Sequence, residues 1–258
     1  MYKSVCVIGL GNMGKAIASS LANDRKVFGI DPLTKENLSG IKRLNSYDEA
    51  LLETDWFVLA VKPQDVKEVC QSFHSPIQLF SIAAGITTRE LFDLLPQDSK
   101  VVRLMPNLPL VVGQGAIGYY AKEEMKKAVV EIFGRMGTLV SVKEESLLDA
   151  VTGLSGSGPA YVLTFLQALA EGGVKSGLNY NDALLLAMQT IQGTLAFYTD
   201  LLGKDPKSHP MEVRNWVTSP GGTTIHGLHA LEEAGFASAV WSAVEAATQR
   251  SKELGKKR

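Results

Sequence analysis

The chain has 258 residues, long enough to bury a sizeable core in one large domain or two smaller ones. A hydrophobic content of 45% and a charged content of 21% are typical of a soluble globular protein. The formal net charge of -1 gives no electrostatic reason to expect nucleic acid or an anionic membrane as a partner. No apolar run approaches the roughly 20 residues that a membrane-spanning helix needs.

The two cysteines, Cys6 and Cys70, show neither CxxC nor metal-ligand spacing. Cys6 lies in an apolar run, and buried reduced thiols are typical of a reducing compartment. The residues before Val5 lead straight into a strand-like segment, without the features of a signal peptide. We therefore expect a cytoplasmic protein.

The first apolar run, Val5–Ile8, has no alternation, as expected of a strand buried on both faces. It leads into the pattern G-x-G-x-x-G and then into residues with helical spacing. In this strand–turn–helix order the pattern predicts a dinucleotide site, with the pyrophosphate at the helix N-terminus. A phosphate loop of the G-x-x-x-x-G-K-[ST] type is excluded, because Ala16 replaces the magnesium-binding hydroxyl. The residues expected to bind the cofactor here are Ile8, Gly9, Leu10, Gly11, Asn12, Met13 and Gly14.

The second predicted strand, Val27–Ile30, ends at Asp31. An acidic residue at this distance from the glycine loop can accept a hydrogen bond from the adenosine ribose 2′-OH, and it repels a 2′-phosphate. The alternative is an ordinary turn residue before Pro32. Asp31 is therefore predicted to bind the cofactor and to favour one without a 2′-phosphate.

Short apolar runs and helical patterns alternate through the first half of the chain. Strands are predicted at 56–61, 79–82 and 101–104, with helices at 47–52 and 64–70 and a helix cap at Thr87 or Thr88. Repeated βα units form largely parallel sheets, and their ligands bind beyond the carboxyl ends of the strands. The further residues expected at that edge are Ala60, Val61, Lys62, Pro63, Ala83, Ala84 and Asn107. For Asn107, a hydrogen bond to a carboxamide and a plain turn between two prolines are equally open.

Two more predicted strands, 116–120 and 139–142, flank a helix at 122–136, and the strand signals stop after Glu144. Helical patterns follow at 158–174, 182–202, 211–216, 219–233 and 236–253. The fold class is therefore α/β: a Rossmann-type doubly wound sheet in residues 1–153, followed by an all-α C-terminal domain in residues 154–258. The two long helices carry apolar residues on more than one face, which predicts burial against a second subunit.

The stretch 219–227 combines a helix start with two glycines. Ser219 is expected to be the N-cap and Pro220 the first residue of a helix that runs to Glu233. Each glycine costs a helix about 1 kcal/mol relative to alanine, so helix stability does not explain the pair. Glycines do let a ligand approach the backbone, and free N–H groups beside hydroxyls bind small anions such as carboxylates. A tight interhelical turn is the alternative to an anion site made by Ser219, Gly221, Gly222, Thr223 and Thr224.

Two other groups of residues are candidate chemical centres. His226 and His229 lie one turn apart on the same predicted helix, but metal ligation needs a third protein ligand. Surface or interface histidines are favoured, and no metal is expected. Lys175 follows glycines within a helix and is similar to the catalytic lysine of β-hydroxyacid dehydrogenases, although a solvated or interface lysine is favoured.

The chain resembles pyrroline-5-carboxylate reductase over essentially its whole length. The resemblance rests on the ordered motifs Gly9–Gly14, Ala60–Pro63, Met105–Asn107, Ser155–Tyr161 and Ser219–Thr224. It implies an NAD(P)H-binding Rossmann domain joined to a helical dimerisation domain, in homodimers that often assemble into decamers. It also implies reduction of the cyclic imine Δ1-pyrroline-5-carboxylate to proline, the last step of proline biosynthesis.

The resemblance further implies the roles of single residues. The substrate carboxylate is expected on Ser219 and on the backbone N–H groups of Gly222 and Thr223, with the catalytic Thr224 hydroxyl at the ring nitrogen. Glu145 matches an acidic position near the family's active site and is expected to bind substrate. No protein nucleophile, Schiff base or metal is required, because a protonated imine already accepts hydride.

Asp31 departs from the NADPH-preferring relatives, which carry small, polar or basic residues at this point. The expectation is therefore NADH, although Lys35 could still receive a 2′-phosphate. The alternative enzyme is a β-hydroxyacid dehydrogenase with Lys175 as acid/base. A different class of function, a nucleotide-binding regulatory protein without turnover, is disfavoured by the complete Ser219–Thr224 motif.

Overall fold

The computed structural model describes residues 4–34 and 37–256. The chain divides into two compact units, Met1–Pro159 with Val244–Arg258, and Ala160–Ala243. The end of the last helix thus belongs to the first unit, whereas the prediction divides the chain once, after residue 153. The two units are described separately below.

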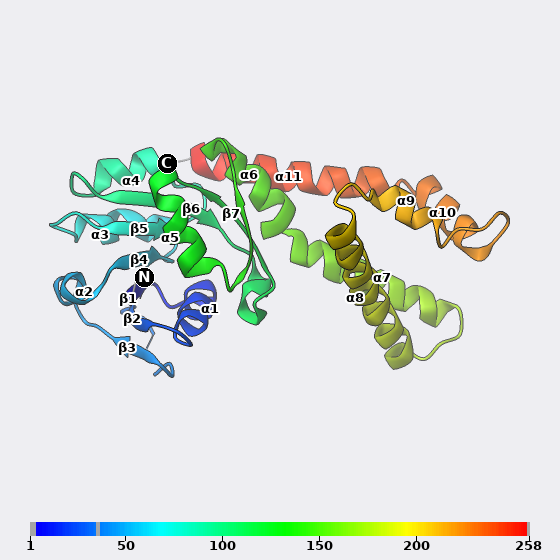
Figure 1. Cartoon of the computed structure of the whole chain (residues 1–258), viewed down its shortest axis with the longest axis horizontal. Helices are drawn as coiled ribbons and strands as arrows, with labels where there is room; N and C mark the ends of the chain where they lie inside the picture. The colour runs from blue at the N-terminus through cyan, green and yellow to red at the C-terminus, as the bar shows by residue number, and fades with distance from the viewer. Residues whose placement is uncertain (1–3, 35–36, 257–258) are drawn as a thin grey trace. The chain divides into compact units, whose positions relative to one another are not determined.

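The first unit contains one eight-stranded sheet within the described residues, with strand order β3-β2-β1-β4-β5-β6-β7-β8 (Figure 1). Neighbouring strands from β3 to β6 are parallel, β7 is antiparallel to β6, and β8 is parallel to β7. The strands are β1 (Ser4–Ile8), β2 (Lys26–Ile30), β3 (Ile41–Arg43), β4 (Trp56–Leu59), β5 (Gln78–Ser81), β6 (Lys100–Met105), β7 (Gly115–Tyr120) and β8 (Gly137–Ser141). The order reverses between β1 and β4, which is where doubly wound sheets bind dinucleotides.

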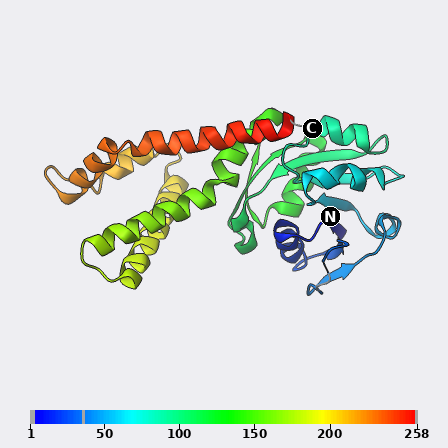
Figure 2. The ribbon, with the colours of Figure 1, turned by 180° about the vertical axis from the view of Figure 1, so that it is seen from behind.

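Helices cover both faces of this sheet, as Figures 1 and 2 show from opposite sides. They are α1 (Asn12–Leu21), α2 (Tyr47–Glu53), α3 (Val66–Gln71), α4 (Thr88–Leu94), α5 (Glu123–Phe133) and α6 (Leu148–Val151). One core joins α1 and α5 to the face that carries Val5, Val58 and Phe80. The other joins α2, α3 and α4 to the face that carries Ile8 and Phe57. Because successive strand residues alternate between these two cores, the central strands β1 and β4 are buried along their whole length.

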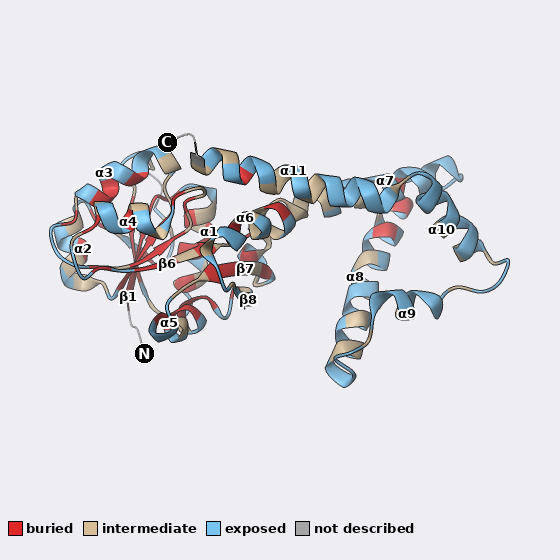
Figure 3. Ribbon diagram, turned by 90° about the horizontal axis from the view of Figure 1, so that it is seen from above, coloured by how far each residue is buried: buried red, intermediate tan, exposed pale blue. Residues whose placement is uncertain are grey.

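The second unit is helical and holds little buried apolar surface of its own (Figure 3). Its helices are α7 (Gly158–Lys175), α8 (Tyr180–Lys204), α9 (Pro210–Asn215), α10 (Thr223–Glu233) and α11 (Phe236–Lys256), of which α7 begins and α11 ends in the first unit. Its only core cluster among the described residues consists of Ala170, Ala183 and Ala187. Large apolar side chains such as Leu163 and Leu195 are exposed instead.

The predicted fold class is confirmed, with some local differences. Strand β3 was not predicted, because three residues at a sheet edge carry too short a pattern. Strand β4 ends at Leu59 and not at Val61, since a 3-10 turn at Pro63–Asp65 follows at once. None of the helices in residues 4–34 and 37–256 is long and apolar enough to cross a bilayer.

Candidate functional site

Three glycines shape the turn between β1 and α1. Gly9 has φ +89°, and a Cβ there would lie 2.8 Å from the Ala60 backbone. A Cβ at Gly14 would lie 1.9 Å from the Gly9 carbonyl oxygen, so only glycine lets α1 approach the turn this closely. A Cβ at Gly11 would meet no atom within 4 Å, so this position faces open space. These are the roles expected in a pyrophosphate cradle: tight turn, close ligand approach and close helix packing.

The start of α1 is free to receive an anion. Its N-cap is Gly11, which has no side chain to cap the first N–H groups. The loops after β4 and β5 lie beside the turn, since the Ala60 N–H donates to the Ile8 carbonyl and the Ile82 N–H to the Leu59 carbonyl. The structure thus brings the predicted segments Gly9–Gly14, Ala60–Pro63 and Ala83–Ala84 to one edge of the sheet. A dinucleotide fits this edge.

Asp31 lies at the end of β2 and binds the glycine turn itself. Its Oδ2 accepts the Leu10 N–H at 2.6 Å, and its Oδ1 accepts the N–H groups of Leu33 and Thr34 at 2.8 and 3.0 Å. Desolvation raises the pKa of the Asp31 carboxyl, but these hydrogen bonds outweigh it and hold the pKa below its ordinary value. Asp31 is therefore an ionised group that fixes the cradle before any cofactor binds.

Arg43, at the end of β3, closes the same turn. Its guanidinium donates to the backbone carbonyls of Asp31 and Thr34. A cavity of about 600 Å³ opens beside them and is also lined by Tyr47. The cavity lies at the end of β2, where a dinucleotide-binding sheet holds the adenosine ribose. Arg43 was missed because β3 was not predicted. Lys35, the predicted alternative partner of a 2′-phosphate, lies outside the described residues.

Asn107 is buried and engaged at both ends of its amide. Its Nδ2 donates to the Ser155 carbonyl at 3.0 Å, and its Oδ1 accepts the Ala116 N–H at 2.8 Å. Ser155 lies in a π-helical turn, Thr152–Gly156, that precedes α7. The amide therefore ties the end of β6 to β7 and to this turn, and the predicted cofactor contact gains no support from these bonds.

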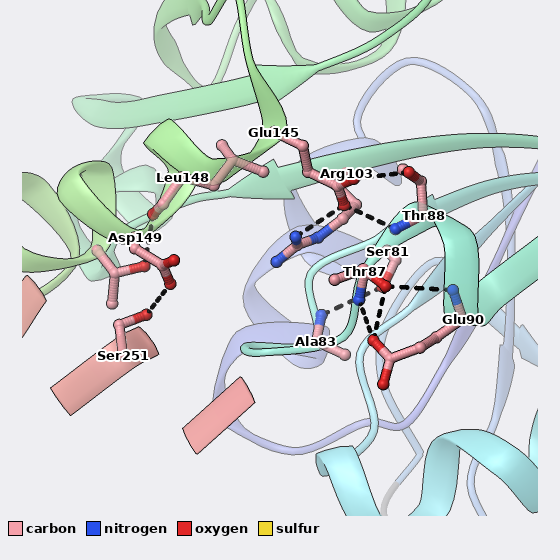
Figure 4. A network of polar contacts seen from close by, with 11 residues as sticks. Ser81, Ala83, Thr87, Thr88, Glu90, Arg103, Glu145, Leu148, Asp149 and Ser251 are labelled. Carbon is pink, nitrogen blue, oxygen red and sulfur yellow. Dashed lines mark hydrogen bonds and ion pairs between the residues drawn. The ribbon is translucent and has the colours of Figure 1, made fainter. Parts of the chain in front are cut away.

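Glu145 binds the start of α4 and the strand β6, as Figure 4 shows. Its Oε1 accepts the Thr88 N–H at 2.6 Å and an Arg103 Nη1 hydrogen at 2.8 Å. Its Oε2 accepts the Thr88 hydroxyl at 2.7 Å. Both oxygens thus have partners within the first unit, and the predicted contact of Glu145 with substrate gains no support from them.

In the second unit, the segment Ser219–Gly222 is a turn and not the start of a helix. The Gly222 N–H donates to the Ser219 carbonyl at 3.0 Å, and Gly221 has φ +69°. Pro220 followed by glycine with positive φ is the sequence of a type II turn. Ser219 as N-cap and Pro220 as first helical residue were therefore wrong: the N-cap is Gly222, and α10 begins at Thr223. Positive φ at Gly221 cannot continue a right-handed helix.

This turn leaves the N-terminus of α10 open beside a hydroxyl. No side chain caps the helix, and the N–H groups of Thr223 and Thr224 meet no acceptor in the part of the chain that the structure describes. A Cβ at Gly222 would lie 2.3 Å from the Ser219 Oγ, so glycine makes room for that hydroxyl. Open N–H groups at the positive end of a helix, next to a hydroxyl, suit a carboxylate.

The remaining predicted candidates, two histidines and a lysine, are exposed. His229 is exposed and lies 3.5 Å from Glu233, and His226 is exposed on the same helix. No group of three or more His, Cys, Asp or Glu residues able to hold a metal occurs among the residues described. Lys175 is the exposed last residue of α7.

Comparison with known proteins shows which family this chain belongs to. The family model for pyrroline-5-carboxylate reductase dimerisation matches residues 145–254, and that for NADP oxidoreductase, coenzyme F420-dependent, matches residues 4–85. Pyrroline-5-carboxylate reductase of Methanosarcina acetivorans is 40% identical over 97% of this chain and 97% of its own length, and pyrroline-5-carboxylate reductase 3 of Rattus norvegicus is 40% identical over 99% and 97%. The crystal structure of Plasmodium falciparum pyrroline carboxylate reductase with NADP bound is similar, with a TM-score of 0.84, 32% identity and 98% coverage of each chain. This chain therefore belongs to the pyrroline-5-carboxylate reductase family.

Proposed function

We propose that this chain reduces Δ1-pyrroline-5-carboxylate to proline with NAD(P)H, the last step of proline biosynthesis. The observation that carries the proposal is the Ser219–Gly222 turn, which leaves unpaired N–H groups at the start of α10 beside a hydroxyl. The substrate is a carboxylate, and its imine needs only a hydride and a proton. Membership of the family and the glycine turn after β1 support the binding of a nicotinamide cofactor.

The cofactor is proposed to bind the carboxyl edge of the sheet. The residues that would hold it are Ile8, Gly9, Leu10, Gly11, Asn12, Met13, Gly14, Asp31, Ala60, Val61, Lys62, Pro63, Ala83, Ala84 and Asn107. When bound, the reduced nicotinamide supplies the hydride. The open space at Gly11 admits the pyrophosphate, and the uncapped start of α1 offers it N–H donors. For Asn107 the proposed contact is a hydrogen bond to the cofactor's carboxamide, which would have to replace a present bond of its amide to Ser155 or Ala116.

The substrate is proposed to bind the start of α10. Its carboxylate would accept hydrogen bonds from the Ser219 hydroxyl and from the N–H groups of Gly222 and Thr223, and Gly221 allows the turn. The Gly222 N–H already donates to the Ser219 carbonyl at 3.0 Å, so the open donors of this site are the N–H groups of Thr223 and Thr224. The Thr224 hydroxyl would hydrogen-bond the ring nitrogen, and it is the proposed catalytic group. These residues act by orienting the imine and excluding water, because hydride transfer requires cofactor ring and acceptor carbon face to face.

We propose that NADH is preferred over NADPH. Asp31 is negatively charged and lies at the cavity beside β2 and β3, where it would repel a 2′-phosphate. Arg43 lines the same cavity, but its guanidinium is engaged with the carbonyls of Asp31 and Thr34. The alternative is a preference for NADPH, since the Plasmodium falciparum relative was solved with NADP bound.

The test is purified protein with Δ1-pyrroline-5-carboxylate, followed by loss of NADH or NADPH absorbance. Substrate-dependent oxidation with a higher kcat/KM for NADH is expected, and a much higher kcat/KM for NADPH would contradict the cofactor preference. Absence of oxidation with either cofactor would contradict the reaction. A Lys175→Met variant should remain active, since the β-hydroxyacid dehydrogenase alternative needs Lys175 as acid/base and the reductase does not.

The proposed assembly and setting follow from the same family. We propose a homodimer through residues 154–258, with further assembly to a decamer, and residues 1–153 as the dinucleotide-binding domain. The match of the dimerisation family to 145–254 and the exposed apolar side chains of the second unit support the dimer. A cytoplasmic location fits Cys6 and Cys70, which are buried free thiols.

A further inference from the structure

The loop between β5 and α4 carries Ala83 and Ala84 and is held at several points. The Ile82 N–H donates to the Leu59 carbonyl at 3.1 Å, and the Ala83 N–H donates to the Ser81 hydroxyl at 3.4 Å. Gly85 has φ +74°, and a Cβ there would lie 3.2 Å from the backbone of Gly255 in α11. The conformation of this loop is thus set by its surroundings and not by the loop alone.

The first turn of α4, which ends the loop, is capped twice (Figure 4). Thr87 and Glu90 form a capping box, in which the Glu90 carboxylate accepts the Thr87 N–H at 2.7 Å and the Thr87 hydroxyl accepts the Glu90 N–H at 3.2 Å. Glu145 takes the next donor, the Thr88 N–H, together with the Thr88 hydroxyl. A helix of seven residues has few interactions of its own, so these caps decide where it begins.

Glu145 also connects this helix start to the sheet. Arg103 lies in β6, next to β5, and its guanidinium donates to the same Oε1 that accepts the Thr88 N–H. The side chains of Arg103 and Glu145 are only 12% and 22% exposed, so the ion pair is partly shielded from solvent. A carboxylate from 57 residues further along the chain therefore fixes the start of α4 against β6.

The strand order tells which part of the cofactor this loop would face. The pyrophosphate cradle follows β1, and Asp31 follows β2 on one side of it. β4 and β5 lie on the other side of β1, so their loops face the opposite end of the dinucleotide, the nicotinamide end.

We propose that Glu145 is a positioning residue for the nicotinamide end of the cofactor, and not a substrate-binding residue. By holding Thr88 against Arg103 it sets the start of α4 and, through it, the segment Ala83–Gly85. This inference rests on the proposed cofactor site. Glu145 then contributes to cofactor binding and not to substrate binding.

The test is Glu145→Gln, which keeps the size of the side chain and removes the charge that binds Arg103 and Thr88. We expect Kd and KM for NADH to rise about ten-fold, because charge-assisted hydrogen bonds are lost, and kcat to fall with the displaced nicotinamide, while the KM for the imine changes less than two-fold. Kd is measured by quenching of protein fluorescence without imine, so it is read even if turnover fails. The matched control is Glu144→Gln, the same change at an exposed neighbouring position, where no effect is expected.

A second variant guards against misfolding of the first. Thr88→Val removes the hydroxyl that binds Oε2 but keeps the N–H, so a smaller rise in Kd for NADH is expected, with no further rise in the Glu145→Gln background. A rise in the KM for the imine with unchanged Kd for NADH would overturn the proposal and return Glu145 to the substrate. A lower melting temperature with neither constant changed would also overturn it, since the residue would then act on stability alone. Failure of the wild type to reduce the imine, with these Kd values as expected, would reject the proposed function only.

Discussion

Three polar side chains near the carboxyl edge of the sheet form hydrogen bonds within the protein itself. Asp31 accepts three backbone N–H groups, Asn107 uses both ends of its amide, and Glu145 accepts three hydrogen bonds. Buried or half-buried polar groups need such partners, because an unpaired one costs the full desolvation of the group. Substitutions at these positions should therefore move a loop first and affect ligand affinity as a consequence.

Asp31 provides a pH-dependent measure of this effect. The pKa of Asp31 is lower in the folded chain than in the unfolded chain, so its ionised form stabilises the fold at pH values above about 4. That stabilisation is lost as the pH falls through the folded-state pKa. The free energy of unfolding of the wild type should exceed that of Asp31→Asn at pH 7, and the difference should shrink as the pH falls toward 3, in urea titrations. A difference for Asp31→Asn that grows on acidification would contradict the prediction.

Thr224 separates catalysis from cofactor binding. Thr224→Ala removes the hydroxyl proposed to bind and orient the imine nitrogen, so kcat should fall about 100-fold, the order of magnitude expected when a reacting group is misplaced. The Kd for NADH should change less than two-fold, because α10 belongs to the second unit and the cradle to the first. Steady-state kinetics and a fluorescence titration measure the two quantities, with Thr138→Ala on strand β8 as a control for the loss of a hydroxyl. An equal loss of NADH affinity would assign Thr224 to the cofactor site.

At the scale of elements, the Pro-Gly-Gly turn defines the proposed substrate site. Pro220 sets the φ of the first turn residue, and Gly221 supplies the positive φ of the second. The third, Gly222, leaves room for the Ser219 hydroxyl. The turn and the helix start thus form one unit, in which each of the three residues has a separate steric task.

Gly222→Ala tests this account of the turn. A Cβ there would overlap the Ser219 Oγ, so the hydroxyl must move away from the helix start, and the KM for the imine should rise at least ten-fold at an unchanged KM for NADH. Gly227→Ala in the same helix is the matched control, because a Cβ there meets no atom within 4 Å. Removing a helical glycine should stabilise α10 by about 1 kcal/mol and leave both KM values unchanged. Equal kinetic effects of the two variants would contradict the steric argument.

The sequence predicts those elements whose structure is decided by neighbouring residues, and not those decided by contacts between distant ones. Buried strands such as β1 and β4 are continuous apolar runs, and the glycine turn follows from local constraints, so both could be predicted. The start of α10 could not, because proline after serine fits both a helix start and a type II turn, and the φ of Gly221 decides between them. The partners of Asp31 and Glu145 are long-range contacts that exist only once the sheet has formed.

At the scale of the whole molecule, the two units differ in how much apolar surface they bury. The first unit has a core on each face of its sheet, including the stack of Trp56 on Phe80 with ring centroids 4.0 Å apart. The second buries three alanines as its core cluster and exposes many larger apolar residues, such as Leu163 and Leu195 at 63% and 60%. Full burial of one leucine contributes about 1.5–3 kcal/mol, so covering these side chains with a partner is expected to stabilise the second unit.

The double variant Leu163→Lys and Leu195→Lys tests that dependence. Two buried charges in a subunit interface are costly, so we expect the assembly to dissociate toward monomers in size-exclusion chromatography with light scattering. The first unit keeps its own two cores, so the Kd for NADH should remain within about two-fold while imine reduction is lost with the helical unit. Leu52→Lys on α2, at a side chain 90% exposed in the first unit, is the matched control and should leave both assembly and activity unchanged. An assembly that survives the double variant would show that the exposed apolar faces of α7 and α8 are not where subunits meet.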